Sequence, residues 1–396
     1  MKTTSLKAFL PLFATLCVIP AALAVTVALM SMSSPLSIAE TIDLNARFLN
    51  SQLLPTGEFI YQGNALTRKP STGYNVVRHA GALYALGHYN RVSPDPNSVA
   101  TMVGAAAWMK ARIGPVPGMK GALSLWDDKP NTALGGAGLA LVGLAELYMV
   151  RPDAIDLETM RGLGHFIVQM QRETGGFYSR YNKVTGVDTE WDSLYYPGEA
   201  ILALIKLFEV DPADEWRDAA VRGLIFLAET RKGMRARELP VDHWAMIATG
   251  ELARVAPNRM TGLLVDHAEQ ICMQAVLRGQ HMGEGFEVTA GAWGKAPLGA
   301  STASATRLEA LLAARPLLAD RPCAAKLDEA IHAGVSFLRR THVVSGPYAG
   351  AVVHHVYEDG ATVGRKDAIK GAATRIDFNQ HSLSAMLRFV EAGLEL

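Results

Sequence analysis

The stretch LETMRGLGHFIVQMQRETGGFY, residues 157–178, contains the unit from which this chain is built. In its first part, apolar residues recur at positions i, i+3, i+4 and i+7 and charged residues occupy the other face, as in an amphipathic helix. The turn TGGFY is expected to end that helix, because glycine commonly lies just beyond a helix C-terminus. Such a helix has one apolar face, so we expect a second helix to cover it.

The second helix follows a polar loop, in the segment YPGEAILALIKLFE that begins at Tyr196. This segment is apolar on nearly every side and rich in alanine and leucine, so it is expected to be buried. Segments of the same type begin at Arg78, Leu134, Asp242, Ala305 and Gln380. Their small residues allow helices to approach closely, and we interpret all six as inner members of one packed array.

The amphipathic type also recurs, for example in residues 214–231 and 327–340. Glycine turns with a following aromatic residue occur at TGEF (56–59), TGGFY (174–178), GEGF (283–286) and SGPY (345–348). One such hairpin cannot bury its apolar face alone, whereas hairpins in sequence can stack on one another. We therefore predict an all-α fold, an (α/α)6 toroid of six helical hairpins that forms a single domain over residues 38–396. An open superhelix is the main alternative.

This layout resembles the (α/α)6 toroid, or six-hairpin glycosidase-like, superfamily over nearly all of residues 38–396. The stretch RGLGHFIVQMQRETGGFY is also similar to the glutamine–aromatic repeats of terpenoid cyclases, with Gln171, Gly175 and Gly176 in the corresponding relation. Members of the superfamily include glycoside hydrolases, polysaccharide lyases, sugar epimerases, terpenoid cyclases and protein prenyltransferases. The resemblance therefore implies a ring-shaped enzyme without selecting one reaction.

The sequence of the N-terminal segment predicts that the chain is exported. Lys2 and Lys7 precede an uncharged run over residues 8–30, and the next cation is Arg47. This asymmetry places the N-terminus in the cytoplasm and the rest in the periplasm or outside the cell. The sequence Ala-Leu-Ala at 22–24 fits a signal peptidase site, and the length of the run also fits an uncleaved inner-membrane anchor. Residues 1–30 are thus expected to be a signal peptide or an anchor, and membrane association through residues 8–30 stays open.

Charge and cysteine usage exclude some partners. Lys+Arg and Asp+Glu both number 38, and no basic run occurs, so a nucleic-acid partner is not expected. After export, Cys272 and Cys323 would form one disulfide or remain two buried thiols. No Cys/His spacing resembles a zinc site, and we predict neither a metal nor a cofactor.

Catalytic candidates lie where the loops enter the predicted inner helices. In a closed ring these loops surround one end, and the helix N-termini there carry partial positive charge. Glu199 lies inside an apolar run, where a buried acid needs a partner, and Glu190 is in the loop before it. His79, His243 and His381 occupy matching positions in three repeats, and His243 and His381 are the catalytic candidates because histidine suits proton transfer near neutral pH. Helix capping or simple burial is the structural alternative for each of them.

Other polar and aromatic residues of the same loops are predicted to bind substrate. They are Arg78, His79, Trp126, Asp127, Trp191, Asp192, Tyr195, Tyr196, Trp244, Glu284, Glu287, Arg307 and Asp377. Sugar rings stack on flat aromatic faces and hydrogen-bond to charged groups, so this mixture favours an oligo- or polysaccharide. Some of the aromatics are expected to fill helix junctions instead.

We therefore predict an exported carbohydrate-active enzyme that acts on an envelope or extracellular glycan. Hydrolysis would use a pair of carboxyl groups, Glu199 with Glu190 or Glu284 with Glu287, and is slightly favoured because it is common. A lyase or epimerase would use His or Tyr as the base, with Arg78 or Arg307 holding a substrate carboxylate. The alternatives are a non-catalytic glycan-binding or scaffold ring and a terpenoid-cyclase-like enzyme.

Overall fold

Two sets of helices alternate along the chain in the computed structural model, which describes residues 36–127, 130–358 and 360–396. The inner set comprises α3 (Val76–Val92), α5 (Leu134–Val150), α7 (Tyr196–Val210), α9 (His243–Val255), α11 (Ser301–Ala314) and α14 (Ile376–Glu391). The outer set comprises α2 (Ile38–Ser51), α4 (Pro96–Lys110), α6 (Leu157–Gln169), α8 (Asp214–Arg231), α10 (Gly262–Val276) and α12 (Ala324–Arg340). The predicted signal or anchor segment, residues 1–30, lies outside the described residues.

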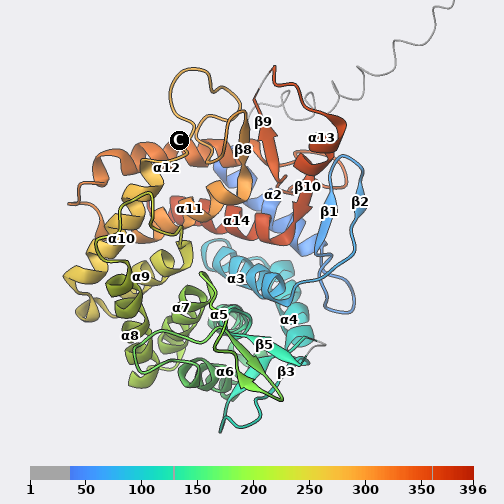
Figure 1. Cartoon of the computed structure of the whole chain (residues 1–396). Helices are drawn as coiled ribbons and strands as arrows, with labels where there is room; N and C mark the ends of the chain where they lie inside the picture. Colours follow the sequence, from blue (N-terminus) through green and yellow to red (C-terminus); the bar gives the residue numbers. More distant parts are fainter. Residues whose placement is uncertain (1–35, 128–129, 359) are drawn as a thin grey trace, which may run out of the picture. The chain divides into compact units, whose positions relative to one another are not determined.

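The inner helices form a closed ring within residues 36–396. Each packs on the next in chain order, and α14 packs on both α11 and α3, so the last inner helix meets the first. Figure 1 shows the inner set in the middle with the outer helices around it. The predicted (α/α)6 toroid is confirmed, and the open superhelix is wrong because α14 lies against α3.

Small residues let the inner helices approach closely. In α5 every residue from Leu134 to Leu147 is buried. A Cβ added at Gly143 would lie 2.9 Å from the Cβ of Leu83 and 3.0 Å from the carbonyl oxygen of Ala80, both in α3. The alanine- and glycine-rich composition that marked these helices in the sequence is therefore a requirement of helix–helix packing.

A glycine turn joins neighbouring outer helices around the ring. Four glycines with positive φ each press against a backbone carbonyl of the following outer helix: Gly57 on Gly104, Gly175 on Arg222, Gly291 on Ala333 and Gly350 on Leu44. The last contact joins the turn after α12 to α2, so it closes the outer layer as well. In the last two cases the glycine lies beyond the predicted GEGF and SGPY turns, whose Gly283 and Gly346 have no neighbour within 4 Å.

Short antiparallel strands gather where the chain enters the inner helices. They are β1 (Gln62–Asn64), β2 (Lys69–Pro70), β3 (Ile113–Pro115), β4 (Leu123–Leu125), β5 (Asn131–Ala133), β6 (Arg180–Asn182), β7 (Gly186–Val187), β8 (Leu298–Ala300), β9 (His355–Tyr357) and β10 (Ala373–Arg375). Their sheets have the orders β10-β1-β2, β3-β4, β5-β6-β7 and β8-β9. In β1 and β10, Gln62 is opposite Arg375, which joins the first hairpin to the last. A short helix, α13 (Arg365–Gly371), precedes β10, and 3-10 turns occupy Pro152–Ala154, Pro257–Arg259 and Arg315–Leu317.

A disulfide joins Cys272 of α10 to Cys323 at the start of α12. The sequence left open whether these residues pair or stay as thiols, and the structure pairs them. Among the described residues, no helix combines the length and the apolar character that crossing a membrane requires.

A candidate active site at one end of the ring

The N-terminal ends of the inner helices bring ionisable side chains together. Arg78 comes from α3, Glu199 from α7, His243 from α9, Arg307 from α11 and His381 from α14. Each interacts electrostatically with at least one other member of the set. We call these five residues the rim cluster. Positions spread over more than 300 residues of sequence thus meet, because every inner helix contributes its N-terminal end to the same side of the ring.

Two histidine rings form the centre of the rim cluster. The rings of His243 and His381 lie 5.3 Å apart, edge to face. Nδ1 of His381 lies 2.8 Å from Oε2 of Glu309, and the hydroxyl of Tyr84 donates to Oε1 of the same carboxylate at 2.9 Å. Glu309 therefore fixes the orientation of His381, whose Nδ1 side faces the carboxylate.

His243 has a different environment. Burial lowers its pKa well below the usual value, and the positive charges of His381, Arg78 and Arg307 lower it further. Its Nε2 atom is buried without a hydrogen-bond partner. His243 is therefore a neutral ring with a free nitrogen, beside a second histidine held by a carboxylate. Different environments of this kind give two similar groups different roles.

The start of α9 is held by a buried ion pair. Asp242 caps the helix by accepting a hydrogen bond from the backbone N–H of Ala245 at 3.1 Å. Its other oxygen accepts from Arg231 at 2.7 Å, and both side chains are buried. His243 directly follows Asp242 in the chain. The cap and the ion pair together therefore fix the position of the His243 backbone.

Glu199 is a buried acid without an ion pair among the described residues. Burial raises its pKa to about 7, against the effect of Arg78, and the nearby charge of Asp242 raises it further. Its Oε2 atom has no hydrogen-bond partner, and any side chain at Gly135 of α5 would collide with it. Glu199 is thus close to half-protonated at neutral pH, as expected for a group able to give or take a proton.

Arg78 and Arg307 are the guanidinium groups of the rim cluster, and Arg375 shares the carboxylate of Asp377 with Arg78. Arg375 binds Asp377 through two hydrogen bonds of 2.9 and 2.6 Å. Arg78 lies 3.5 Å from the same carboxylate, which Arg375 already occupies. Arg307 donates to the backbone oxygen of Ala303, and its Nε atom is buried without a partner.

Aromatic side chains line the edge of the cluster. Tyr195 is 41% exposed, and its ring lies 5.3 Å from that of His243. The rings of Trp191 and Tyr196 lie 5.7 Å apart, with Arg180 over Trp191 at 3.6 Å. Trp244 is buried beneath the cluster, 5.5 Å from His381. Flat aromatic faces therefore lie beside the ionisable groups.

The structure places other predicted site residues elsewhere. His79 is buried between α3 and α4, where it bonds Tyr74 and the carbonyl of Ala105 and stacks on Trp108, and burial lowers its pKa to about 4. Trp126 is buried, with Lys183 over its ring, and Asp127 is exposed.

The remaining predicted acids lie at the surface. Glu190, Glu284 and Glu287 are exposed, so neither predicted carboxylate pair is brought together in a buried site. Asp192 pairs with Arg172 at 2.8 Å, outside the rim cluster.

Sequence reasoning missed a buried ionic network beneath the cluster. From Glu309 it runs through Tyr84 and Arg388 to Glu251, and then through Lys206 to Glu146. Its charged members interrupt inner helices that are otherwise largely apolar, which is the signal that identified Glu199.

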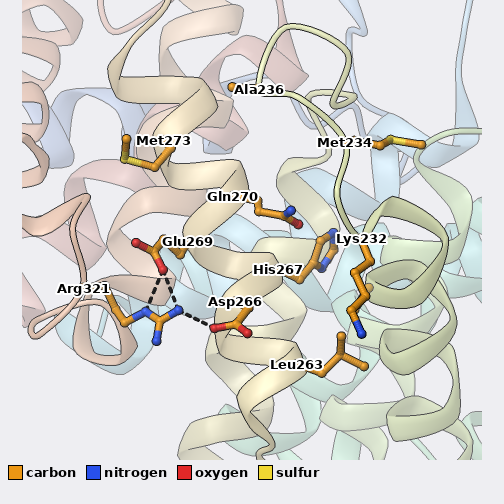
Figure 2. A pocket seen from close by; sticks show the side chains of 11 residues that line it. Lys232, Met234, Ala236, Leu263, Asp266, His267, Glu269, Gln270, Met273 and Arg321 are labelled. Atoms are coloured by element: carbon orange, nitrogen blue, oxygen red, sulfur yellow. Dashed lines mark hydrogen bonds and ion pairs between the residues drawn. The ribbon is translucent and has the colours of Figure 1, made fainter.

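A separate cavity of about 340 Å³ lies in the outer layer between α8 and α10. Figure 2 shows Arg321, which pairs with Asp266 and Glu269, at one side of it. Its wall includes His267, whose Nε2 lies 3.4 Å from Arg231, the partner of Asp242. This cavity therefore borders the Arg231–Asp242 ion pair at the start of α9, and its lining includes neither His243 nor His381.

Comparisons with known proteins identify the fold. No family model matches the sequence. No curated protein matches it. A sugar epimerase from a ruminal bacterium matches with a TM-score of 0.69 and 12% identity, over 91% of this chain and 99% of that one. Cellobiose 2-epimerase from Spirochaeta thermophila matches with a TM-score of 0.64 and 14% identity, over 96% and 100%. An unsaturated glucuronyl hydrolase specific for heparin matches with a TM-score of 0.61 and 11% identity, over 90% and 97%. At these identities the likeness shows the toroid fold alone.

Proposed function

We propose that this chain is a carbohydrate-active enzyme that moves a proton at a sugar carbon next to a carbonyl group, as an epimerase or isomerase does. The observation that carries the proposal is the pair of His243 and His381, whose rings lie 5.3 Å apart. A sugar substrate is supported by the aromatic edge of the site and by the fold, which the chain shares with a sugar epimerase and a cellobiose 2-epimerase.

His243 is the base in this proposal. Its lowered pKa keeps the ring neutral near pH 7, and its free Nε2 atom accepts the proton from the sugar carbon. Removing that proton places negative charge on the adjacent carbonyl oxygen, giving an enediolate. The guanidinium group of Arg78 stabilises this charge, since it already acts electrostatically on His243.

His381 is the acid. The carboxylate of Glu309 lies 2.8 Å from Nδ1 and orients the ring, so Nε2, on the other side of the ring, donates a proton to the carbon from another direction. One proton leaves the sugar to His243 and one arrives from His381, so the sugar keeps its composition while the configuration of the carbon inverts. Protons exchanged with water return the two rings to their starting states.

Hydrolysis, which the sequence slightly favoured, has weaker geometric support. A glycosidase needs a second carboxyl group facing its general acid. Glu199 has a suitable raised pKa, but Asp242 and Asp377 are both held by arginines. The geometry therefore favours the histidine chemistry.

The test is proton exchange with solvent. The purified full chain is incubated in D₂O with reducing mono- and disaccharides, and NMR follows loss of the signal of the proton next to the carbonyl. We expect exchange with the wild type and a loss of about 10²- to 10⁴-fold in His243→Asn and in His381→Asn. His332→Asn, in outer helix α12, is the matched control and should retain the wild-type rate.

Other outcomes select other functions. New reducing ends from glycans, with activity that survives both histidine substitutions and is lost in Glu199→Gln, would identify a glycosidase. Glycan binding without exchange or cleavage would support a non-catalytic ring, and turnover of an isoprenoid would support a terpenoid-cyclase-like enzyme.

We also propose that the chain is exported. The uncharged run of residues 8–30 and the disulfide between Cys272 and Cys323 both support an oxidising compartment. Fractionation of cells that express the full chain tests this: recovery of the chain in the cytoplasm with free thiols would contradict it.

A further inference from the structure

Arg307 is a cation without a counter-ion in the rim cluster. It forms no ion pair with any described residue, and its Nε atom is buried without a hydrogen-bond partner. Other arginines of the interior are matched to acids, such as Arg231 to Asp242 and Arg388 to Glu251. Removing a cation from water without a partner is costly, so a position of this kind calls for an anion.

The N-terminal residues cannot provide that anion. Residues 1–35 contain no aspartate or glutamate. Arg78 lies 3.5 Å from Asp377, and Arg375 already binds both oxygens of that carboxylate. Arg307 in α11 and Arg78 in α3 both flank α14, so two cations border the helix that carries His381.

From these observations we infer that the site takes a negatively charged sugar, and that Arg307 binds its acidic group. This inference rests on the proposed function for the reacting atoms and adds the class of substrate. The acidic group is a carboxylate or phosphate carried by the sugar. The planar guanidinium suits oxygens of such groups because it donates two parallel hydrogen bonds.

The neighbours of Arg307 fit this assignment. It acts electrostatically on His243 and with Tyr195, so it lies on the same side of the ring as the proposed base and the exposed aromatic face. A sugar with its acidic group on Arg307 would therefore extend its ring toward Tyr195 and its carbonyl end toward the histidines. A neutral sugar would leave Arg307 without a partner, which favours the charged substrate over its neutral analogue.

The experiment compares matched charged and neutral sugars. Binding of D-glucuronate, D-glucose 6-phosphate and D-glucose to the full chain is measured by calorimetry, and proton exchange in D₂O is measured for each. We expect the wild type to bind at least one charged sugar about 10- to 100-fold more tightly than glucose, as charge-assisted hydrogen bonds require. The two charged probes distinguish a carboxylate site from a phosphate site.

Substitutions assign the preference to Arg307. Arg307→Gln should abolish it, so that charged and neutral sugars bind alike, whereas Arg307→Lys should retain part of it. Arg222→Gln, which removes an exposed guanidinium of outer helix α8, is the control and should leave it unchanged. Equal weakening of charged and neutral sugars by Arg307→Gln would overturn the inference, as would a wild type with no preference.

The two proposals fail in different ways. Exchange on neutral sugars without a charge preference contradicts the anionic substrate and leaves the histidine chemistry standing. Tight, Arg307-dependent binding of an acid without proton exchange, in a chain that folds normally, contradicts the histidine chemistry and leaves the acidic substrate standing.

Discussion

The carboxyl group of Glu199 is buried without an ion pair, so its protonation state depends mainly on burial. Its pKa is about 7 in the folded chain, compared with 4.5 for an unperturbed group. A raised pKa means that folding favours the protonated form. The stabilisation is complete below pH 4.5 and is lost as the pH rises through 7.

This linkage predicts how Glu199→Gln changes stability with pH. Glutamine resembles the protonated acid and cannot ionise. The stability of the variant relative to the wild type should therefore increase as the pH rises. Between pH 5 and pH 8 we expect the difference in free energy of unfolding to shift by about 2.5 kcal/mol in favour of the variant. Urea denaturation at both pH values measures it.

Glu190→Gln is the control, because Glu190 is exposed and its variant should follow the wild type at both pH values. A constant difference between wild type and Glu199→Gln would show that Glu199 is ionised throughout this range. Activity is a separate readout: if Glu199 takes part in proton transfer, the variant loses turnover even where it is the more stable protein.

The sequence selected candidate site residues where a charge interrupts an apolar helix or where a histidine recurs at matching repeat positions. Both rules led to Glu199, His243 and His381. They could not tell that His79, at the same repeat position, turns toward Trp108. That difference depends on the neighbouring outer helix, which repeat spacing does not specify.

At the level of elements, the glycine turn links neighbouring outer helices. A Cβ at Gly175 would lie 2.7 Å from the carbonyl oxygen of Arg222, and the backbone there has φ of 93°. Gly186 has a similar φ of 80° but no neighbour within 4 Å. Comparing alanine substitutions at Gly175 and Gly186 therefore separates the cost of backbone strain from the cost of a steric collision.

We expect Gly175→Ala to lower the free energy of unfolding by about 2–4 kcal/mol, the sum of strain and overpacking. Gly186→Ala should lose only about 1–2 kcal/mol, from strain alone. Chemical denaturation of the two variants measures both values. Equal losses would mean that the turn adapts without disturbing α8.

The start of α9 gives a second prediction at this scale. Arg231→Met would leave the buried carboxylate of Asp242 without its partner, and we expect a loss of about 3–5 kcal/mol. Adding Asp242→Asn should recover much of that loss, since asparagine removes the charge and still caps the helix. Denaturation of the single and double variants tests this, and simple additivity would show that the two residues are not coupled.

Element positions were predictable because composition separates the two helix types. The inner helices are rich in alanine and leucine, and the outer helices have one polar face. The turns were harder to predict, because Gly291 and Gly350 make the contacts that we expected of the GEGF and SGPY turns. Glycine is required where the turn meets a backbone carbonyl of another helix. For Gly291 that carbonyl belongs to Ala333, more than 40 residues away in sequence.

For the molecule as a whole, the disulfide joins two outer helices that the ring also holds together. Cys272 and Cys323 are separated by 51 residues, a loop for which the chain-entropy model gives about 4 kcal/mol of stabilisation. We expect the double substitution Cys272→Ser/Cys323→Ser to lower the melting temperature of the chain measurably in non-reducing buffer. A reductant should lower it by a similar amount in the wild type and leave the variant unchanged.

If the reductant does not lower the melting temperature of the wild type, the two thiols do not pair in solution. Retention of native circular dichroism in the double variant would show that the helix ring, and not the covalent bond, specifies the fold. The sequence alone could predict a ring from six hairpins, but pairing of two cysteines depends on the approach of α10 to α12.

Closure through α14 has a consequence for synthesis. Because residues 376–391 fill the gap between α11 and α3, a growing polypeptide that still lacks them has two unsatisfied apolar edges, one at each end of an arc. Residues 376–391 must leave the ribosome before these edges can meet. Nascent chains should therefore depend on chaperones until residues 376–391 have been synthesised, and truncations that remove α14 should yield insoluble material.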